Sequence, residues 1–219
     1  MAAPGRTIRI VYVTSSDYKR AENEAFRTVQ RLADGALVGD GFDFDLRTVR
    51  VQEILHVDIE AMVREEVKSA YRNVRVPCIV EHAGLIFPEY GDKSFPGGLT
   101  KPMWDVLGEK FLEETHSARR AAIARAVVAY TDGMTVKTFI GERKGTLADT
   151  PRGSRSFYWD TVFIPDDPKR RAVNMTYAEI VDDPNLGLKY KMDGLSQSAI
   201  AMVGFLEYRR VNPPPLWWE

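Results

Sequence analysis

Two residues that could act as an acid and a base stand side by side at Glu81 and His82, directly after the apolar run 78–80. Carboxylates and imidazoles are among the side chains that most often transfer protons in catalysis. A glycine-containing loop at 95–98 and Lys101 follow them. Polar groups at the end of an apolar strand, facing such a loop and a lysine, suit an anionic ligand. The same residues also fit a hairpin with a surface acid and histidine, since short motifs often occur by chance.

A second candidate site lies near the N-terminus. The β-branched and aromatic run 8–14 predicts a buried strand, and the hydroxyl-rich turn 14–17 predicts the start of a helix. The amide groups and dipole of a helix N-terminus attract phosphate, and a nearby lysine adds positive charge. The candidate phosphate-binding residues are Thr14, Ser15, Ser16 and Lys19. The glycines of a Walker loop are missing, so this pattern alone does not identify the ligand.

Hydrophobic periodicity predicts the elements that position these residues. Helices are expected at 17–34, 58–73, 102–116 and 195–206, and strands at 8–14, 42–51, 78–80, 122–131 and 134–140. Asp160 interrupts the aromatic run 157–165. An acid within such a run usually lies at an exposed edge of the sheet and less often faces a ligand. The interleaved helices and strands predict an α/β fold with a mixed sheet.

Composition excludes several classes of protein. The chain of 219 residues suffices for one large domain or two small lobes. Its 30 basic and 31 acidic residues give a net charge of −1, which offers no support for nucleic-acid binding. Cys78, the single cysteine, lies in an apolar run and is expected to be a core thiol in a reducing compartment. The N-terminal apolar stretch is too short for a signal peptide or a membrane span, so we expect a cytoplasmic protein.

Five segments occur in the order and with the spacing of one known family. Residues 14–22 (TSSDYKRAE) resemble its T-G-N-x-x-K-x-x-E, residues 80–85 (VEHAGL) its V-E-D-T-G-L, and residues 95–101 (FPGGLTK) its L-P-G-P-x-x-K. The run 139–160 resembles its F-x-G … G-x-I … P-R-G … F-G-W-D, and residues 176–179 look like its T-Y-A-E. Together these segments resemble the inosine triphosphate pyrophosphatase family over about residues 8–209.

The resemblance implies a fold and a reaction. The expected fold is α/β, a long twisted mixed sheet with two lobes and a central nucleotide cleft. It would form a single domain over residues 1–212, usually as a homodimer, followed by an apolar C-terminal tail at 213–219. The expected reaction is the attack of water on the α-phosphorus of a purine nucleoside triphosphate, with Mg²⁺ as cofactor.

The resemblance also assigns roles to individual residues. It places Thr14, Ser16, Lys19 and Lys101 at the phosphates and makes Glu53 the metal-holding glutamate. The base would be bound by residues of the two late motifs: Phe157 as the stacking ring, with Trp159, Asp160, Ser196 and Gln197. Glu81 and His82 remain the candidate catalytic residues.

The sequence departs from the family in the catalytic motif. His82 stands where the family has an aspartate, and Glu66 stands at the position of a helical lysine. An imidazole is a poor ligand for a hard ion such as Mg²⁺. It can nevertheless act as a base near neutral pH, so this exchange alone does not exclude activity.

A second departure lies in the late K-x-x-x-S-H-R motif. Gln197 and Ser198 replace the histidine and the arginine, and Met192 replaces the lysine, with Lys191 adjacent. Gln197 can still read a purine edge, because an amide both donates and accepts hydrogen bonds. Ser198 cannot supply the charge-assisted donor of an arginine.

Three hypotheses follow from this selective loss of charged groups. The first is a sensor that binds a deaminated purine triphosphate (dITP, ITP or XTP) with impaired hydrolysis and signals to an effector protein subunit, as in anti-phage defence. The second is an active pyrophosphatase with altered base preference. The third is an interaction protein that binds no nucleotide. The apolar tail with Trp217 and Trp218 is a candidate docking element for a partner, or else packs on its own fold.

Overall fold

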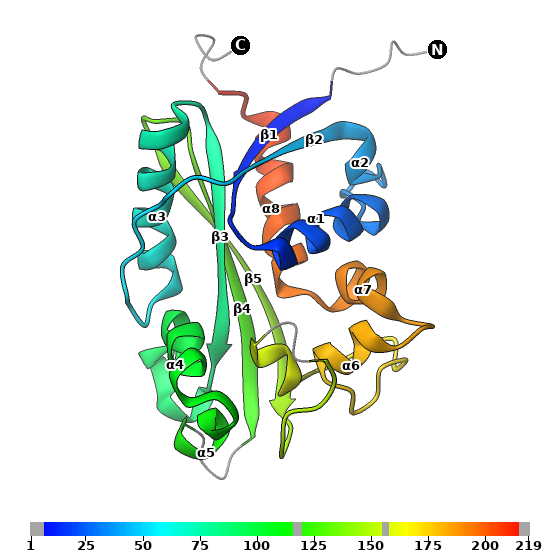
Figure 1. The fold of residues 1–219 in the computed structure, drawn as a ribbon. Helices are drawn as coiled ribbons and strands as arrows, with labels where there is room; N and C mark the ends of the chain where they lie inside the picture. Colours follow the sequence, from blue (N-terminus) through cyan, green and yellow to red (C-terminus); the bar gives the residue numbers. More distant parts are fainter. Residues whose placement is uncertain (1–6, 116–119, 155–157, 215–219) are drawn as a thin grey trace.

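One six-stranded mixed sheet organises the fold (Figure 1). The computed structural model describes residues 7–115, 120–154 and 158–214. The strand order is β2-β1-β3-β4-β5-β6, with β1 (Ile8–Val13), β2 (Phe42–Arg47), β3 (Cys78–Ile86), β4 (Ala121–Thr131), β5 (Val136–Leu147) and β6 (Phe163–Pro165). β1 runs parallel to β2 and β3, whereas the pairs from β3 to β6 are antiparallel. The predicted α/β class with a mixed sheet is therefore confirmed.

Helices cover both faces of the sheet (Figure 1). They are α1 (Asp17–Val29), α2 (Val38–Gly41), α3 (Ile59–Val74), α4 (Thr100–Leu107), α5 (Phe111–Thr115), α6 (Tyr177–Asp182), α7 (Gly187–Tyr190) and α8 (Gln197–Val211). α3 packs on one face through a cluster that includes Val67 and Val80. α1 and α8 pack on the other face through Phe26 and Phe205. A third cluster, with Phe111 and Tyr177, joins α5 and α6 near the lower ends of β3 and β4.

The expected end of a strand after residue 80 is wrong, because β3 continues to Ile86. β4 pairs with β3 in one unbroken register from Cys78 to Ile86. Gly84 permits this path: a Cβ atom there would lie 2.2 Å from the carbonyl oxygen of Gly97, in the short turn η2 (Gly97–Leu99) that crosses the strand. Glu81 and His82 therefore lie in the middle of a central strand.

Other boundaries also differ from the predictions. The expected helix over 102–116 is divided into α4 and α5, because Gly108 adopts a φ of 56° at the end of α4. β5 extends to Leu147, well beyond the predicted residue 140. Cys78 is buried, as expected for a core thiol. Within the described ranges, no helix is long and apolar enough to cross a membrane.

Candidate functional site

The N-terminal turn of α1 places Lys19 against the middle of β3. Ser16 caps this helix, since its hydroxyl oxygen accepts a hydrogen bond from the Lys19 amide at 3.3 Å. Thr14 supports the turn by accepting from the Ser16 amide at 3.2 Å, while Ser15 is exposed. The side-chain oxygens of Thr14 and Ser16 are thus engaged by the turn itself. The Lys19 ammonium extends to β3, where it donates to the main-chain oxygen of Glu81.

The Glu81 carboxylate is an anchor for Lys19. Its Oε2 lies 3.4 Å from Lys19 Nζ and accepts from the Tyr12 hydroxyl at 2.9 Å, while Oε1 accepts from the Ser198 hydroxyl at 2.9 Å. Burial raises the pKa of the Glu81 carboxyl, but Lys19, Ser198 and Tyr12 together hold it below its usual value. Glu81 is therefore ionised and fully engaged by protein groups. The sequence predicted that Ser198 lacks the charged donor of an arginine. In the structure its hydroxyl donates to the Glu81 carboxylate.

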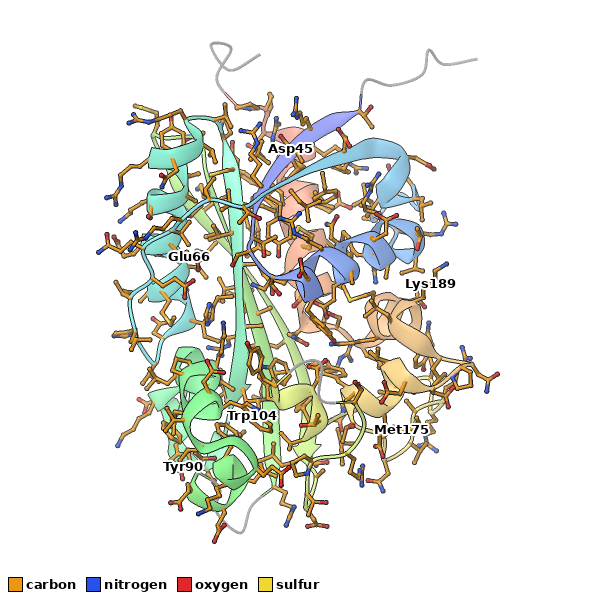
Figure 2. All side chains as sticks on the ribbon, viewed as in Figure 1. Asp45, Glu66, Tyr90, Trp104, Met175 and Lys189 are labelled. Atoms are coloured by element: carbon orange, nitrogen blue, oxygen red, sulfur yellow. The ribbon has the colours of Figure 1, made fainter. Side chains whose placement is uncertain are left out.

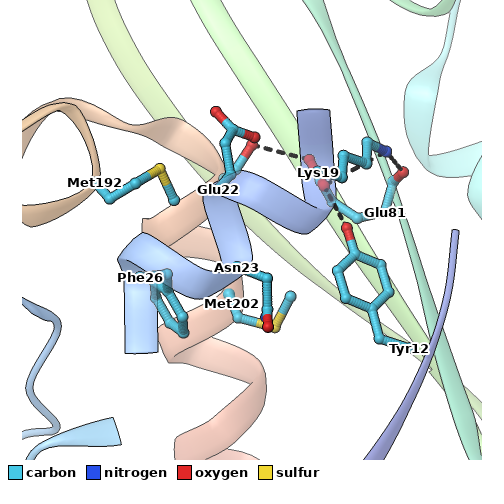
Figure 3. Close-up of a pocket in the computed structure, with 9 residues that line it drawn as sticks. Tyr12, Lys19, Glu22, Asn23, Phe26, Glu81, Met192 and Met202 are labelled. Atoms are coloured by element: carbon cyan, nitrogen blue, oxygen red, sulfur yellow. Dashed lines mark hydrogen bonds and ion pairs between the residues drawn. The ribbon is translucent and has the colours of Figure 1, made fainter. Parts of the chain in front are cut away.

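A small cavity lies beside this ion pair (Figure 3). Its volume of about 20 Å³ is enough for a water molecule. Its walls combine the Glu81 group with residues of α1 and α8 and with the chain before α8: Tyr12, Lys19, Glu22, Asn23, Phe26, Glu81, Met192, Ser198 and Met202. A cavity of this size does not hold a nucleotide.

His82 faces the opposite side of β3. Side chains alternate along a strand, so His82 points to the face on which Val80 packs against α3. Its Nε2 atom is buried and has no hydrogen-bond partner among the described residues. Burial, Lys19 and Lys101 lower the pKa of His82 to about 4, although Glu81 opposes them. The imidazole is therefore neutral at pH 7.

Glu66 lies on α3 (Figure 2), and the charges of Lys19, Lys101 and Glu81 act on it as they do on His82. Its Oε2 atom is also buried, without a hydrogen-bond partner in the part of the chain that the structure describes. Burial raises the pKa of Glu66 to about 7; Glu53 and Glu81 add to this effect, and Lys19 and Lys101 oppose it. Both predicted phosphate-binding lysines thus act on Glu66 as well as on His82. Glu66, which the resemblance aligns with a lysine of the family, thus contributes a buried carboxyl group.

The residues around Glu66 are compatible with a divalent metal ion that arrives with phosphate. Mg²⁺ is usually held by one or two carboxylates together with substrate phosphates. Glu53 is exposed on the segment between β2 and α3, and its charge acts on Glu66. No group of three or more His, Cys, Asp or Glu side chains that could hold a metal ion occurs within the described ranges. The described residues therefore offer single carboxylates, at Glu53 and Glu66, and no preformed metal site.

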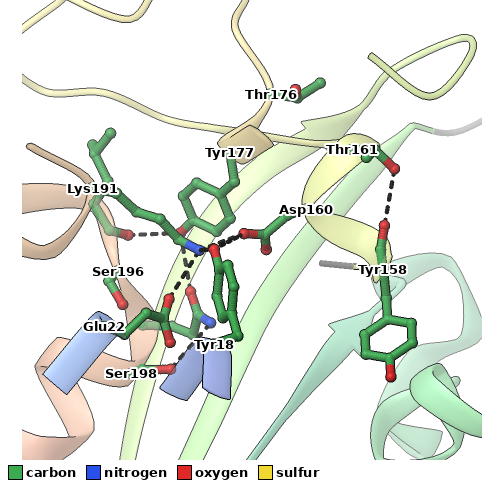
Figure 4. A network of polar contacts seen from close by, with 12 residues as sticks. Tyr18, Glu22, Tyr158, Asp160, Thr161, Thr176, Tyr177, Lys191, Ser196 and Ser198 are labelled. Carbon is green, nitrogen blue, oxygen red and sulfur yellow. Dashed lines mark hydrogen bonds and ion pairs between the residues drawn. The ribbon is translucent and has the colours of Figure 1, made fainter. Parts of the chain in front are cut away.

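A second polar group lies on the other side of the site, around Lys191 (Figure 4). Lys191 is 1% exposed and begins the π-helical turn η5 (Lys191–Leu195). Its ammonium contacts Asp160 Oδ2 at 2.5 Å, the Tyr18 hydroxyl at 2.7 Å and Glu22 Oε1 at 3.0 Å. The expectation that Asp160 lies at an exposed edge is wrong, since it is 1% exposed and paired with this lysine.

The π-helical turn accounts for the different surroundings of Lys191 and Met192. A π-helical turn contains one more residue than an α-helical turn. The turn closes with a hydrogen bond from the Ser196 amide to the Lys191 carbonyl at 2.9 Å. Lys191, five residues before Ser196, therefore lies inside the polar group, while Met192 lines the small cavity.

The predicted base-binding residues have different environments. Ser196 caps α8 by accepting from the Ala199 amide at 3.2 Å, and Gln197 Oε1 accepts from the Tyr177 hydroxyl at 3.0 Å. Trp159 is 1% exposed and its ring packs in the core against Phe163 and Tyr177, so its part in base binding stays a prediction. Phe157 lies outside the described residues.

Lys101 completes the site from α4. It is exposed, and its ammonium lies 5.4 Å from the centre of the Tyr158 ring. Tyr158 opens the 3₁₀ turn η4 (Tyr158–Thr161), which also carries Asp160. Lys19 and Lys101 thus both act on Glu66, and Lys101 also lies beside the turn that carries Asp160.

Several residues of the site were missed by sequence reasoning. Tyr18, Glu22 and Tyr177 contact Lys191 or its partners, and Tyr12 binds Glu81. Tyr18 directly precedes Lys19, so its place in the first turn of α1 was the one signal that could have indicated it. Nothing local in the sequence indicates the role of Tyr12, which depends on the neighbouring strand.

Comparisons with known proteins show the family to which the chain belongs. Residues 10–183 match the model of the Ham1 family. A dITP/XTP pyrophosphatase of Saccharolobus solfataricus is 32% identical over 146 residues, which is 65% of this chain and 75% of that protein. Inosine triphosphate pyrophosphatase 2 of Trypanosoma cruzi is 28% identical over 180 residues, 80% of this chain and 82% of that protein.

Solved structures of Ham1 proteins share the fold of this chain. The structure of the Staphylococcus aureus Ham1 protein superposes with a TM-score of 0.59 at 17% identity, over 92% of this chain and 99% of that chain. A HAM1 protein from Coxiella burnetii also gives a TM-score of 0.59, over 92% of this chain. The family resemblance predicted from the five motifs is confirmed, and the chain belongs to the Ham1 family.

Proposed function

We propose that this protein binds a deaminated purine nucleoside triphosphate, of the dITP, ITP or XTP type, and hydrolyses it poorly. Lys19 and Lys101 would bind the phosphates, because the positive charges of both lysines act on Glu66 and on His82. The Asp160 group on η4 would bind the base. The relatives named as dITP/XTP and inosine triphosphate pyrophosphatases support this class of ligand.

The observation that carries the proposal is the state of His82. A neutral imidazole lies at the centre of β3, where the resemblance implies a carboxylate, and its Nε2 is buried and unpartnered among the described residues. A neutral group contributes no negative charge for holding a metal ion. On this proposal the phosphate-binding lysines are kept while one catalytic charge is missing, which is the combination expected of a sensor.

A sensor needs a partner that responds to it. We infer a cytoplasmic homodimer that passes the bound state to an effector protein subunit, for example in anti-phage defence. The segment 213–219 is the candidate contact, although its tryptophans Trp217 and Trp218 lie outside the described residues.

Glu66 supports a second candidate, an active pyrophosphatase with altered base preference. Its carboxyl group, together with Glu53, would hold Mg²⁺ against the phosphates. When bound, such an ion neutralises charge that develops on the phosphates. His82 would accept a proton from the attacking water through its unpartnered Nε2.

One experiment separates these functions. The pure protein is mixed with ITP, dITP, XTP or ATP and Mg²⁺, and both pyrophosphate release and the thermal unfolding midpoint are followed. A rise of the midpoint without turnover supports the sensor, because a ligand that binds only the native state stabilises it. Turnover at the rate of a dITP/XTP pyrophosphatase assayed alongside overturns the sensor and supports the enzyme. No shift and no turnover with any nucleotide overturns both and leaves an interaction protein.

A further inference from the structure

Each of the three N–H groups of the Lys191 ammonium has an acceptor within the protein. An ammonium group has three N–H donors and no acceptor. Lys191 directs them to Asp160 Oδ2 at 2.5 Å, the Tyr18 oxygen at 2.7 Å and Glu22 Oε1 at 3.0 Å (Figure 4). Lys191 therefore joins η4 to two positions on α1. It holds other side chains in place and has no donor left for a ligand.

Tyr18 fixes the same carboxylate from a second side. Its hydroxyl donates to Asp160 Oδ2 at 2.6 Å while it accepts from Lys191. Tyr18 and Lys191 thus both bind the one oxygen Oδ2. This arrangement sets the plane and rotamer of the Asp160 side chain.

The other oxygen of Asp160 is left without a donor. Oδ1 is buried and has no hydrogen-bond partner among the residues that the structure describes, in a side chain that is 1% exposed. A buried carboxylate oxygen without a donor is costly, so a ligand that supplies an N–H group there gains affinity. Figure 4 shows Asp160 between Tyr18 and Tyr158, whose ring lies beneath the Lys101 ammonium.

We propose that Tyr18 is a positioning residue for base recognition, which holds Asp160 so that Oδ1 accepts the N1–H of a 6-oxopurine. This inference rests on the proposed nucleotide-binding function. Hypoxanthine, xanthine and guanine carry a hydrogen on N1, whereas adenine N1 is itself an acceptor. Adenine would place two acceptors against each other, and a site built for a donor rejects a group that lacks it.

The position of Tyr18 in α1 joins base recognition to phosphate binding. Tyr18 and Lys19 are consecutive residues of the first helical turn, about 100° apart around the axis. Tyr18 faces Asp160, and Lys19 faces Glu81. One rigid turn therefore sets both the base end and the phosphate end of the site.

The test compares the dissociation constants of ITP, ATP and inorganic triphosphate by calorimetry without metal. Tyr18→Phe should weaken ITP binding about tenfold and lower the preference for ITP over ATP by a similar factor, as expected for a hydrogen bond to a charged group. Triphosphate binding should stay within about twofold. Tyr190→Phe is the matched control, because the Tyr190 hydroxyl donates to Asp167 at 2.8 Å, outside this group. It should alter none of the three constants.

A double-mutant cycle separates positioning from a general loss of structure. If Tyr18 acts through Asp160, adding Tyr18→Phe to Asp160→Asn should change ITP binding by less than about twofold. Additive losses, or ITP binding to Tyr18→Phe that is unchanged or tighter than wild type, would overturn the inference while the proposed function stands. Absence of ITP binding to the wild-type protein would overturn both.

Discussion

Lys19 on α1 and Glu81 on β3 form an ion pair, with 3.4 Å between Nζ and Oε2, at the point where the first helix meets the central strand. The Glu81 side chain is 4% exposed, and its oxygens also accept hydrogen bonds from Tyr12 and Ser198. This pairing fixes the lysine that the proposed function assigns to phosphate. It also shows why Glu81 is better understood as an anchor than as a catalytic base.

Removal of this anchor should destabilise the protein. Glu81→Ala leaves the Lys19 charge without its carboxylate and two hydroxyl groups without their acceptor, and breaking a buried ion pair costs about 3 kcal/mol in the free energy of unfolding. Urea unfolding measures this change. Glu24→Ala, which removes an exposed partner of Arg27 at 3.9 Å, should cost less than about 0.5 kcal/mol. Equal effects of the two substitutions would contradict the anchoring role.

Replacement of the central imidazole should change turnover. His82→Asp places a carboxylate beside Lys19 and Lys101, and we expect pyrophosphate release from ITP with Mg²⁺ to rise at least about tenfold. His56→Asp adds the same charge on the exposed segment before α3 and should leave the rate unchanged. A fall in turnover in His82→Asp would show instead that His82 is the working base.

The raised pKa of Glu66 predicts how stability depends on pH. Because its pKa is about 7 in the folded protein, against about 4.5 when unfolded, the folded state binds this proton more tightly. The stability that protonation of Glu66 contributes is complete below about pH 4.5 and is lost as pH rises through about 7.

Glu66→Gln should remove this dependence. Wild type loses the Glu66 contribution between pH 5 and pH 8, and the variant does not. The free energy of unfolding of Glu66→Gln minus that of wild type should therefore increase over this range by on the order of 2 kcal/mol. Urea unfolding with EDTA at both pH values checks the change. Glu65→Gln, at a half-buried neighbour that is paired with Lys68 at 2.6 Å, serves as control. Parallel pH profiles for wild type and Glu66→Gln would refute the prediction.

Lys101 should contribute to affinity and little to stability. Lys101→Ala removes an exposed ammonium beside Tyr158, so the unfolding midpoint should stay nearly constant. Affinity for triphosphate should fall about tenfold at low salt, and the loss should shrink at high salt because exposed charges are screened. Lys110→Ala, at the end of the turn η3 (Gly108–Lys110), is the control and should not alter the affinity. An unchanged dissociation constant for Lys101→Ala would remove this lysine from the site.

The sequence alone determined the fold class and the order of the segments. Apolar periodicity and helix caps are local properties, so the starts of α1, α3 and α8 lie close to their predicted places. The five motifs identified the family, because their glycines and lysines keep fixed spacing along the chain. The motifs also named Lys19 and Lys101, and both act electrostatically on Glu66 in the structure.

Only the tertiary structure decided which side chains meet. The alternation of β3 sends Glu81 toward Tyr12 and Ser198 and His82 toward α3, because neighbouring strand residues point to opposite faces. The crossing of α1 over the sheet brings Tyr18 to Asp160, 142 positions away in the chain. Such contacts depend on how elements pack, and a linear pattern of residue types does not contain that information.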